Sequence, residues 1–496
     1  MSGIRSCGFL SLERIRKVRR INNMCFHINR GTEQEIRRKN RHAGRQALMT
    51  ALALACSLCL WGCGVSDFFR TSPAPDTEEI IGEIAQKETE DEKAPEQEST
   101  SAKAGKRLQE VQMQEAEHQD YFYAEEKQIE EKESSFSKSD MDEKREQIGL
   151  SEAGIVGLQE SQHGNYYFGQ LDSAEKVLYV EIYQTLALME EEILLSTTDV
   201  SLLPVVYQAV INDHPEFFYL NGYIYTRFMQ QGEIKYIIFS GRYLYDAAEV
   251  ERRQAVIDRI VDEKMTQFAE YGCYETVKAV YEYLILSTEY SMDSLDNQNI
   301  CSVFLDKKSV CNGYAKAAQY LLNNCGIPCI IVNGTAAGSP HAWNIVEMYG
   351  EYYHMDVTWG DPSYYAGGGD EKGGVPDIDY SYLGVTTAEI SKNHSMDQTF
   401  SLPLCDAIQD NYFVREGRYL YGYDEGQIEE IFEEAKGRGE SAVCIKASDR
   451  QAYQEIFDNL IGEQTIFDYF GVYQEGGEYK IAYSGNEDLC TISFWE

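Results

Sequence analysis

The sequence predicts an α+β fold in which a cysteine stands at the N-terminus of a helix packed on an antiparallel sheet. Three observations predict it. Apolar residues recur at helical spacing in several stretches, and strand-like runs rich in aromatic and β-branched residues lie between them. A helix-forming run that begins next to Cys311 is followed by two strand-like runs joined by a tight turn. We expect this core at 273–413, flanked by smaller α+β segments at 165–272 and 414–496.

The charge of the chain excludes one class of partner. Its 82 acidic and 44 basic residues give a formal net charge of -38, which would repel the phosphates of a nucleic acid. The basic residues gather in the first fifty positions, where they outnumber the acidic ones. We therefore expect no nucleic-acid partner, and a different role for the N-terminal end than for the rest.

Residues 1–63 are typical of a basic extension followed by an export signal. Basic residues around 37–45 precede an apolar stretch, 47–61, which is too short for a permanent transmembrane helix. The stretch ends in Leu60-Trp61-Gly62-Cys63, which resembles the lipobox of bacterial lipoproteins and implies lipidation of Cys63. We expect an exported protein held by its lipid on the outer face of the cytoplasmic membrane. An uncleaved membrane anchor is the alternative.

Residues 64–160 are predicted to form an acidic tether. The stretch is rich in Glu, Gln, Lys and Ser and poor in aliphatic residues, so it cannot bury enough apolar surface to offset the entropy of ordering. We expect it to be disordered or loosely helical, with a solvated helix conceivable at 109–131. Such a tether would lift the following domain from the membrane into the cell wall.

Residues 165–272 alternate between helix and strand patterns. Helices are expected at 174–195, 202–211 and 247–271, and strands at 217–228 and 234–239 with Gln231-Gly232 in the turn between them. His214 stands before a proline where the second helix ends. We expect it to cap that helix rather than to bind a ligand.

Cys311 is predicted to begin a helix. After a helix at 274–286, residues 312–324 contain strong helix formers with an apolar stripe, and Gly326 and Pro328 supply the stop. Unpaired N–H groups at a helix N-terminus stabilise a thiolate. Gly313 leaves room there for close approach of the backbone.

A histidine and an aspartate follow on a predicted hairpin. We expect a strand at 327–332, a loop at 333–340 that delivers His341, and two strands joined at Tyr349-Gly350. If Met348 pairs with Glu351, His341 faces Thr358, and Asp356 lies diagonally opposite His341 on the same face of the sheet, within side-chain reach. A slip of one residue would place them on opposite faces.

Three motifs in this segment together resemble the transglutaminase-like superfamily, a papain-related group of cysteine enzymes. They are Val310-Cys311-Asn312-Gly313-Tyr314-Ala315, His341-Ala342-Trp343-Asn344 and Asp356-Val357-Thr358-Trp359, with Asp361 and Pro362 after the last. Ser309 stands where the family usually has glycine. The resemblance covers 274–363 strongly, and 377–413 looks like the continuation found in bacterial lipoprotein members.

The resemblance implies a catalytic triad and no cofactor. Cys311 would be the nucleophile, His341 the base and Asp356 the group that orients the base. The backbone N–H of Cys311 is the first candidate for an oxyanion donor, and Gln298 is a second. The reaction implied is acyl transfer: water as acceptor gives a peptidase or amidase, which we favour, whereas an amine gives protein cross-linking. The substrate would be a peptide or protein at the cell surface, and the lipid anchor the only membrane contact.

The same residues allow other interpretations. Cys311 could be a buried structural thiol, and the domain could be a non-catalytic module that binds peptide or cell wall. His354 could replace His341 as the base, although we expect it to pack, and we expect His394 to be a solvated loop residue. Cys325 and Cys329, with Cys311 and His341, could suggest zinc, but a second tight ligand pair is lacking, so we expect no metal site.

The cysteine count has its own consequence. Eight cysteines follow the lipobox, so seven remain if Cys311 is the nucleophile, and at least one of them must be unpaired: Cys273, Cys301, Cys325, Cys329, Cys405, Cys444 and Cys490.

The C-terminal part carries no chemical motif. We expect strands at 418–423, 442–447, 479–483 and 490–495 and helices at 427–436 and 449–460, which make a small α/β appendage. The glycine-rich stretch 367–374 lacks the strand-before, helix-after context of a phosphate-binding loop and is expected to be a flexible surface loop.

Overall fold

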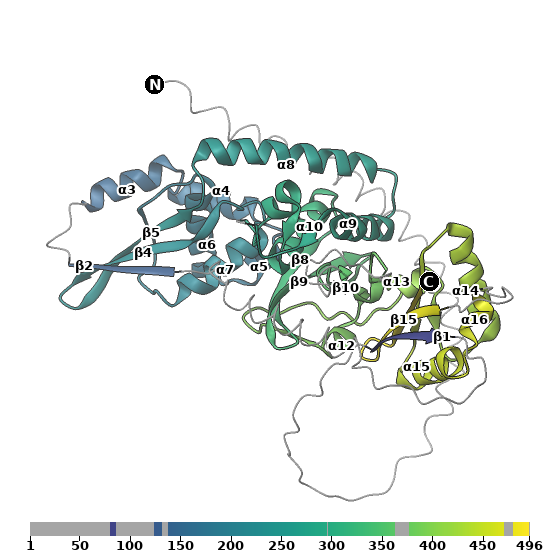
Figure 1. The fold of residues 1–496 in the computed structure, drawn as a ribbon. Coiled ribbons are helices and arrows are strands. Elements are labelled where there is room, and N and C mark those ends of the chain that lie inside the picture. The colour runs from purple at the N-terminus through teal and green to yellow at the C-terminus, as the bar shows by residue number, and fades with distance from the viewer. Residues whose placement is uncertain are drawn as a thin grey trace, which may run out of the picture. The chain divides into compact units, whose positions relative to one another are not determined.

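A computed structural model describes residues 80–85, 124–130, 137–294, 296–362, 376–470 and 480–495. Figure 1 shows the helices and strands in chain order. The described part is a mixed α+β structure, and its longer strands lie in three sheets of four or five strands. The predicted fold class is therefore confirmed. Residues 1–63 with Cys63, and the glycine-rich stretch 367–374, lie outside the described residues.

The first sheet has the strand order β2-β4-β5-β3. β4 (Leu220–Gln230) and β5 (Glu233–Tyr243) form the predicted hairpin, and Gln231 and Gly232 take φ of 54° and 85° in its turn. β2 (Ala124–Glu130) is parallel to β4, and β3 (Ile193–Leu194) is antiparallel to β5. The helices of this segment are α3 (Lys138–Gln147), α4 (Glu152–Ser161), α5 (Tyr166–Gln170), α6 (Ser173–Ala187) and α7 (Leu202–Asp213).

Two expectations for this region were wrong. The helix expected at 174–195 ends at Ala187, because Met189 and Glu192 adopt φ of 55° and the chain then enters the buried strand β3. The expected tether contains regular structure: α3 and α4 are capped by Ser137 and Ser151, and residues 124–130 form a strand rather than part of a helix.

Polar contacts explain why the composition of residues 64–160 led to a wrong prediction of disorder around α3. Arg145 of α3 donates to the buried carboxylate of Glu181 at 2.6 Å, and Gln184 donates to the carbonyl of Ile148 at 2.7 Å. Specific hydrogen bonds between distant residues therefore dock α3, although few of its own side chains are apolar. The composition of a segment gives its number of apolar residues but does not predict such pairs.

The central sheet has the order β11-β10-β9-β8-β12. Its strands are β8 (Cys329–Ala336), β9 (Ser339–Met348), β10 (Glu351–Met355), β11 (Leu383–Val385) and β12 (His394–Met396). The predicted register is confirmed, because Met348 pairs with Glu351 and Tyr349-Gly350 forms the turn with φ of 53° and 90°.

The flanks of this hairpin differ from the prediction. The loop expected at 333–340 is mostly strand, and the turn is confined to Ala337-Gly338, with φ of 45° and 83°. β10 ends at Met355, so Thr358 does not face His341 in the ladder. The chain turns there because one oxygen of Asp356 accepts hydrogen bonds from the backbone N–H groups of Thr358 and Trp359.

Three helices lie with this sheet in one continuous apolar core. α10 (Cys311–Asn324) contacts β8 and β9, α9 (Cys273–Ser287) contacts α10, and the long α8 (Ala247–Gln267) passes over α10 in Figure 1. The buried cluster runs from Tyr167 through α8, α9 and α10 to Phe413, and it also includes Cys444 and Leu489 of the C-terminal part. The residues expected to form an N-terminal segment and a catalytic domain therefore share their core.

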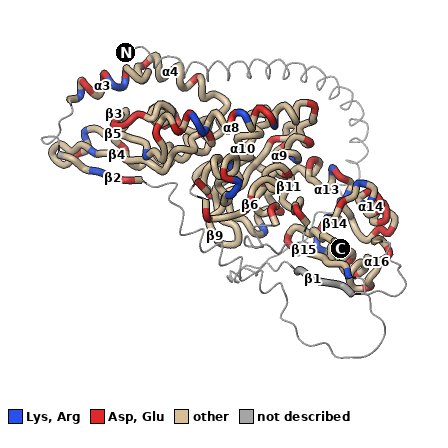
Figure 2. Tube along the Cα trace, turned by 45° about the horizontal axis from the view of Figure 1, so that its top comes forward, with Lys and Arg blue, Asp and Glu red and all other residues tan. Residues whose placement is uncertain are grey.

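The C-terminal sheet has the order β1-β15-β16-β14-β13 and a core of its own. Its elements close to predicted ones are α14 (Glu425–Arg438), β14 (Ala442–Ala447), α15 (Arg450–Phe457), β15 (Lys480–Asn486) and β16 (Thr491–Trp495). The strand expected at 418–423 is only the two-residue β13 (Tyr419–Leu420), and α16 (Ile466–Tyr469) was not predicted. The edge strand β1 (Ile80–Ala85) comes from the stretch expected to be a disordered tether. Figure 2 shows acidic residues concentrated on α14. Lys446 of β14 pairs with Glu389 at 2.9 Å, which links this sheet to the central segment.

The shorter elements are β6 (Glu289–Tyr290), β7 (Lys308–Ser309), α12 (Thr387–Ile390) and α13 (Tyr412–Arg415). Among the helices that the structure describes, none combines the length and the apolar character needed to cross a bilayer.

Candidate active site

Cys311 is the first residue of α10, as predicted, and 7% of its surface is exposed. Val310 before it is extended and donates its N–H to the carbonyl of Asn297 at 3.2 Å. Ser309 contacts the hydroxyl of Ser302 at 2.7 Å and the Asn297 carbonyl at 3.1 Å. The serine that departs from the family motif thus has a buried hydrogen-bonding role at the start of this helix.

Gly313 allows this close approach. A Cβ at Gly313 would lie 2.0 Å from Oγ of Ser309 and 2.6 Å from Oγ of Ser302, and 3.0 Å from the Asn297 carbonyl oxygen. Real side chains do not approach so closely, so the segment 297–302 can pack against the first turn of α10 only if residue 313 has no side chain.

His341 lies on β9 and is 4% exposed. Its Nε2 lies 2.8 Å from Oδ2 of Asp356, which leaves Nδ1 for the thiol of Cys311. Burial alone would lower the pKa of His341, but the charge of Asp356 and the hydrogen bonds with Asp356 and Cys311 raise it well above its usual value. The structure therefore brings the three predicted residues together in one contact chain.

Asp356 is fully buried at the end of β10 and accepts four hydrogen bonds. Oδ1 accepts from the N–H groups of Thr358 and Trp359 at 2.9 and 3.1 Å, and Oδ2 accepts from His341 and His394 at 2.8 and 3.0 Å. Burial would raise the pKa of Asp356, but His341 and the hydrogen bonds outweigh it and hold the pKa well below the usual range. The carboxylate is thus kept ionised.

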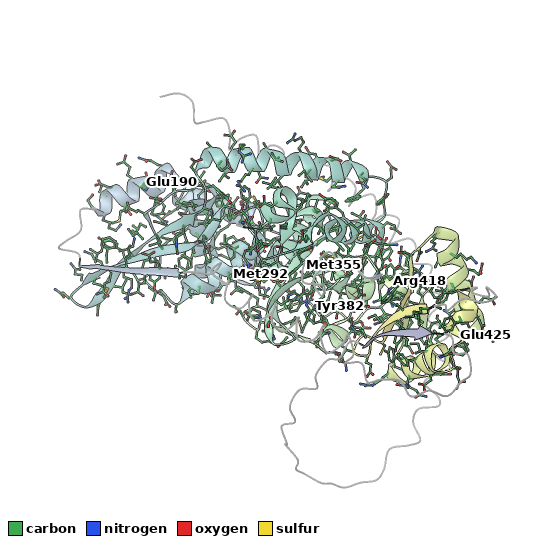
Figure 3. All side chains as sticks on the ribbon, viewed as in Figure 1. Glu190, Met292, Met355, Tyr382, Arg418 and Glu425 are labelled. Atoms are coloured by element: carbon green, nitrogen blue, oxygen red, sulfur yellow. The ribbon has the colours of Figure 1, made fainter. Side chains whose placement is uncertain are left out.

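The backbone of this turn is also held. The N–H of Asp356 donates to the carbonyl of Tyr382 at 3.0 Å. Figure 3 labels Tyr382 and Met355, the last residue of β10, in the central part of the molecule. Further along, the hydroxyl of Tyr314 on α10 donates to Oδ2 of Asp361 at 2.7 Å. Both ends of the segment that carries Asp356 are therefore tied to neighbouring elements.

The expectation that His394 is a solvated loop residue was wrong. His394 begins β12, which pairs with β8, and it is 4% exposed with its Nε2 3.0 Å from Oδ2 of Asp356. The surrounding sequence Ser391-Lys392-Asn393-His394 is polar and β12 has only three residues, so neither composition nor periodicity indicated burial.

His354 packs as expected. Nε1 of Trp343 donates to its Nδ1 at 3.0 Å, and its Nε2 lies 3.1 Å from the hydroxyl of Thr387. Burial lowers the pKa of His354 to about 3, so it is a neutral acceptor in the core. His214 caps α7 and contacts Glu216 at 2.8 Å and Gln162 at 2.9 Å.

One group of side chains in the described ranges has the residue types and spacing of metal ligands. His341, Asp356 and His394 form the group found there, with candidate ligand atoms within 4.8 Å of one another. Asp356 lies 2.8 Å from His341 and 3.0 Å from His394, which are hydrogen-bond distances, so the three side chains form a proton-linked network. Cys325 and Cys329, raised above as zinc ligands, lie outside it. Among the described residues, the eight cysteines form no disulfide.

The second oxyanion candidate, Gln298, lies beside the helix start. Its Oε1 accepts a hydrogen bond from Nδ2 of Asn312 at 3.0 Å, and the residue is half-buried. The preceding residue, Asn297, is the one that accepts from Val310 and Ser309. Gln298 is thus held next to Cys311 by two independent sets of contacts.

Comparisons with known proteins identify the same segment. Residues 257–357 match the model of the transglutaminase-like superfamily. The kyphoscoliosis peptidase of Mus musculus is 21% identical over 136 residues, and the match covers 24% of this chain and only 21% of the mouse protein.

Two solved structures are also similar. One is a crystal structure of a TGase, with a TM-score of 0.21 and 14% identity, covering 28% of this chain and 50% of that one. The other, a candidate cysteine protease from Cytophaga hutchinsonii, has a TM-score of 0.20 and 14% identity and covers 27% and 61%. The matched family segment includes Cys311, His341 and Asp356, and the chain therefore contains a transglutaminase-like domain.

Proposed function

We propose that this protein is a thiol acyl-transfer enzyme in which Cys311 is the nucleophile, His341 the proton carrier and Asp356 the group that orients His341. The observation that carries the proposal is the buried contact chain through His341. One ring nitrogen lies 2.8 Å from the Asp356 carboxylate, and a hydrogen bond with Cys311 helps to raise the pKa of the ring. A thiol needs such a base, and the base needs an acceptor that fixes its tautomer.

The steps follow from these contacts. His341 takes the proton of the Cys311 thiol as the sulfur attacks the carbonyl carbon of a carboxamide, and the C–O π electrons move onto the oxygen. The N–H of Cys311 and the amide of Gln298 are the donors proposed for that oxyanion. His341 protonates the amine, which leaves, and a thioester remains. Water then attacks the thioester with His341 as base, and the acid and free thiol are released.

The role proposed for Gln298 is supported by how its amide is held. Asn312 donates to Oε1 at 3.0 Å, so the Nε2 end of the amide is the one that can donate to a substrate oxygen. Gln298→Leu should therefore slow acylation without reducing thiol alkylation, because alkylation develops no oxyanion.

The acceptor decides between two reactions. Hydrolysis of a peptide or amide bond is favoured, since the mouse relative is named a peptidase. Cross-linking by an amine acceptor is the alternative in a transglutaminase-like domain. Adding a primary amine to the assay separates them: a transamidase incorporates the amine into product, whereas a hydrolase releases the carboxylic acid at an unchanged rate.

The substrate and location are proposed from the N-terminal residues. The signal-like stretch 37–63 supports export and lipidation at Cys63, which would present the domain to peptides or proteins at the cell surface. Expression in a bacterial host with Cys63→Ser as control tests this. Cleavage before an acylated Cys63, seen by mass spectrometry and lost in the variant, supports the anchor. An unprocessed N-terminus in both proteins contradicts it.

Selective alkylation tests the proposed nucleophile. Iodoacetamide at pH 6, followed by peptide mapping, should label Cys311 first and should lose that preference in His341→Ala. Cys273 and Cys325 are internal controls, because both are more exposed than Cys311 while burial raises the pKa of each thiol to about 11. Labelling of Cys311 no faster than these two thiols would overturn the proposal.

A further inference from the structure

Asp356 has a second imidazole partner that a cysteine–histidine–aspartate mechanism does not require. Oδ2 accepts from Nε2 of His341 at 2.8 Å and from Nε2 of His394 at 3.0 Å. Both imidazole side chains and the carboxylate are almost completely buried, with side-chain exposures of 2%, 0% and 0%. Water therefore cannot replace either imidazole as a donor without a cavity opening in the core.

The ring of His394 is enclosed by aromatic side chains. Its centroid lies 5.0 Å from the ring of Trp343, 4.8 Å from Trp359 and 5.4 Å from His341. Gly334 of β8 makes room for this arrangement. A Cβ there would lie 2.0 Å from the carbonyl of Ser395 on β12 and 3.0 Å from the Trp343 ring.

Both ring nitrogens of His394 lie within hydrogen-bonding distance of an oxygen atom, and Nε2 is the one that donates to Asp356. Burial lowers the pKa of His394 and the charge of His341 lowers it further, whereas the hydrogen bond to Asp356 and the charge of that carboxylate act in the opposite direction. Oδ1 of Asn393, which can only accept, lies 2.6 Å from Nδ1 of His394, and Nδ2 of Asn393 donates to the hydroxyl of Tyr382 at 3.3 Å. His354 also interacts electrostatically with this ring, and its own low pKa leaves it neutral.

We propose that His394 is a positioning residue for the reaction: its Nε2–H holds Oδ2 of Asp356 and shares the negative charge of that carboxylate, which sets the basicity of His341. This inference rests on the proposed acyl-transfer function. A carboxylate oxygen that donates its electron density to two N–H groups attracts each proton less than it would attract one. His394 therefore limits how tightly Asp356 holds the proton of His341, and it fixes where the carboxylate lies.

Two substitutions separate this role from packing. His394→Phe keeps the ring shape and removes the donor, whereas His394→Gln offers an amide N–H near the position of Nε2. We expect the alkylation rate of Cys311 by iodoacetamide at pH 7 to fall by about tenfold to a hundredfold in His394→Phe, because the carboxylate loses a fixed contact. His394→Gln should restore most of the rate.

The pH profile supplies a readout that packing alone would not move. Without the His394 donor, the charge of Asp356 acts on His341 alone and raises the pKa of His341. The alkaline inflection of the alkylation rate should therefore move to higher pH in His394→Phe. It should stay near its original position in His394→Gln. If His394→Phe does not fold, His394→Asn takes its place. Its shorter amide cannot reach Asp356, and it should give the same slow rate and the same shift.

The outcomes are distinguishable. Three results together support the inference. Cys311 is labelled selectively in the unaltered protein, His394→Phe reacts more slowly with its alkaline inflection at higher pH, and His394→Gln restores the rate and the inflection. Selective labelling with an unmoved inflection in the donor-free variant overturns the role of His394 and leaves the proposed function standing. Equally slow phenylalanine and glutamine variants also overturn it. Absence of selective labelling in the unaltered protein overturns the proposed function and this inference with it.

Discussion

The side chain of Asn344 on β9 donates a hydrogen bond from Nδ2 to the backbone carbonyl of Ala315 on α10, at 2.9 Å. The same amide nitrogen lies 3.2 Å from the carbonyl of Ile330 on β8. One fully buried side chain therefore joins the strand that carries His341 to the helix that begins at Cys311. This bridge fixes the separation of the proposed base and nucleophile.

Replacing that bridge should affect reactivity and stability together. We expect Asn344→Ala to lower the free energy of unfolding by about 1–3 kcal/mol, because buried hydrogen-bonding groups lose their partner. It should also slow alkylation of Cys311, since β9 can then shift relative to α10. Urea unfolding and thiol labelling measure the two effects.

Asn323→Ala is the matched control. Asn323 lies near the C-terminal end of α10, whereas Cys311 is the first residue of that helix. The side chain of Asn323 exchanges hydrogen bonds with the backbone of Cys329 at 2.9 and 3.1 Å. It should lower stability without changing the relative reactivity of Cys311. Equal loss of reactivity in both variants would show that Asn344 acts only through general stability.

Gly313 should not tolerate even one methyl group. Gly313→Ala places a Cβ 2.0 Å from Oγ of Ser309, so either the segment 297–302 or the start of α10 must move. We expect a loss of about 1–3 kcal/mol in the free energy of unfolding, which is typical of overpacking.

Gly437→Ala on α14 is the control for the same substitution. An added Cβ there meets no heavy atom within 4 Å, and alanine is the better helix former, so stability should rise by about 0.5–1 kcal/mol. Thermal melting of both variants makes the comparison. Equal effects at the two glycines would mean that the contacts around Gly313 do not matter.

The Asp356–His341 pair should make the free energy of unfolding depend on pH, with stability lost at both low and high pH. The lowered pKa of Asp356 contributes stability above its unfolded value of about 4, and this is lost as pH falls through the folded pKa. The raised pKa of His341 contributes stability below its unfolded value of about 6.5, and this is lost as pH rises through the folded pKa.

Asp356→Asn removes both contributions. The stability difference between the unaltered protein and this variant should therefore be largest between about pH 4 and 6.5 and should shrink in both directions. Urea midpoints across pH 3–10 measure it. The variant should also react about 10³–10⁴-fold more slowly with substrate, because an amide cannot select the required tautomer of His341. A pH-independent difference would contradict the assigned ionisation states.

The hairpin register was predictable because turn chemistry and side-chain alternation act over a few residues. Tyr349-Gly350 marked the turn, and His341 and Asp356 then had to share a face. The end of α10 at Asn324 was equally local, because Gly326 and Pro328 follow it and stop the helix. Such signals need no knowledge of distant contacts.

The burial of His394 depends on contacts that no local pattern carries. His394 contacts Asp356 although it lies thirty-eight positions later in the sequence, on the three-residue strand β12. This strand pairs with β8 at Gly334. The docking of α3 through Arg145 and Glu181 is similar, since two polar residues far apart in sequence stabilise each other. Sequence reasoning assigned both segments to solvent because it judged each one by its own composition.

His354 should not share the role of His341. His354→Asn keeps an acceptor for Nε1 of Trp343, which is the hydrogen bond that the structure gives to Nδ1. Because burial keeps this ring neutral, with a pKa of about 3, we expect unchanged labelling of Cys311 at pH 6. His341→Asn, the same change at the proposed base, should abolish the preference for Cys311. Equal losses in the two variants would reopen the choice of base.

The most direct test of the proposed chemistry is to trap the acyl-enzyme. The protein is mixed with a p-nitrophenyl ester at pH 7 and quenched in acid, and the modified residue is mapped by mass spectrometry. We predict one acyl group on Cys311, removable by hydroxylamine as a thioester is, and formed at least about a hundredfold more slowly when His341 is replaced by alanine. Acylation spread over several thiols, or on Cys311 at the same rate without His341, would contradict the account.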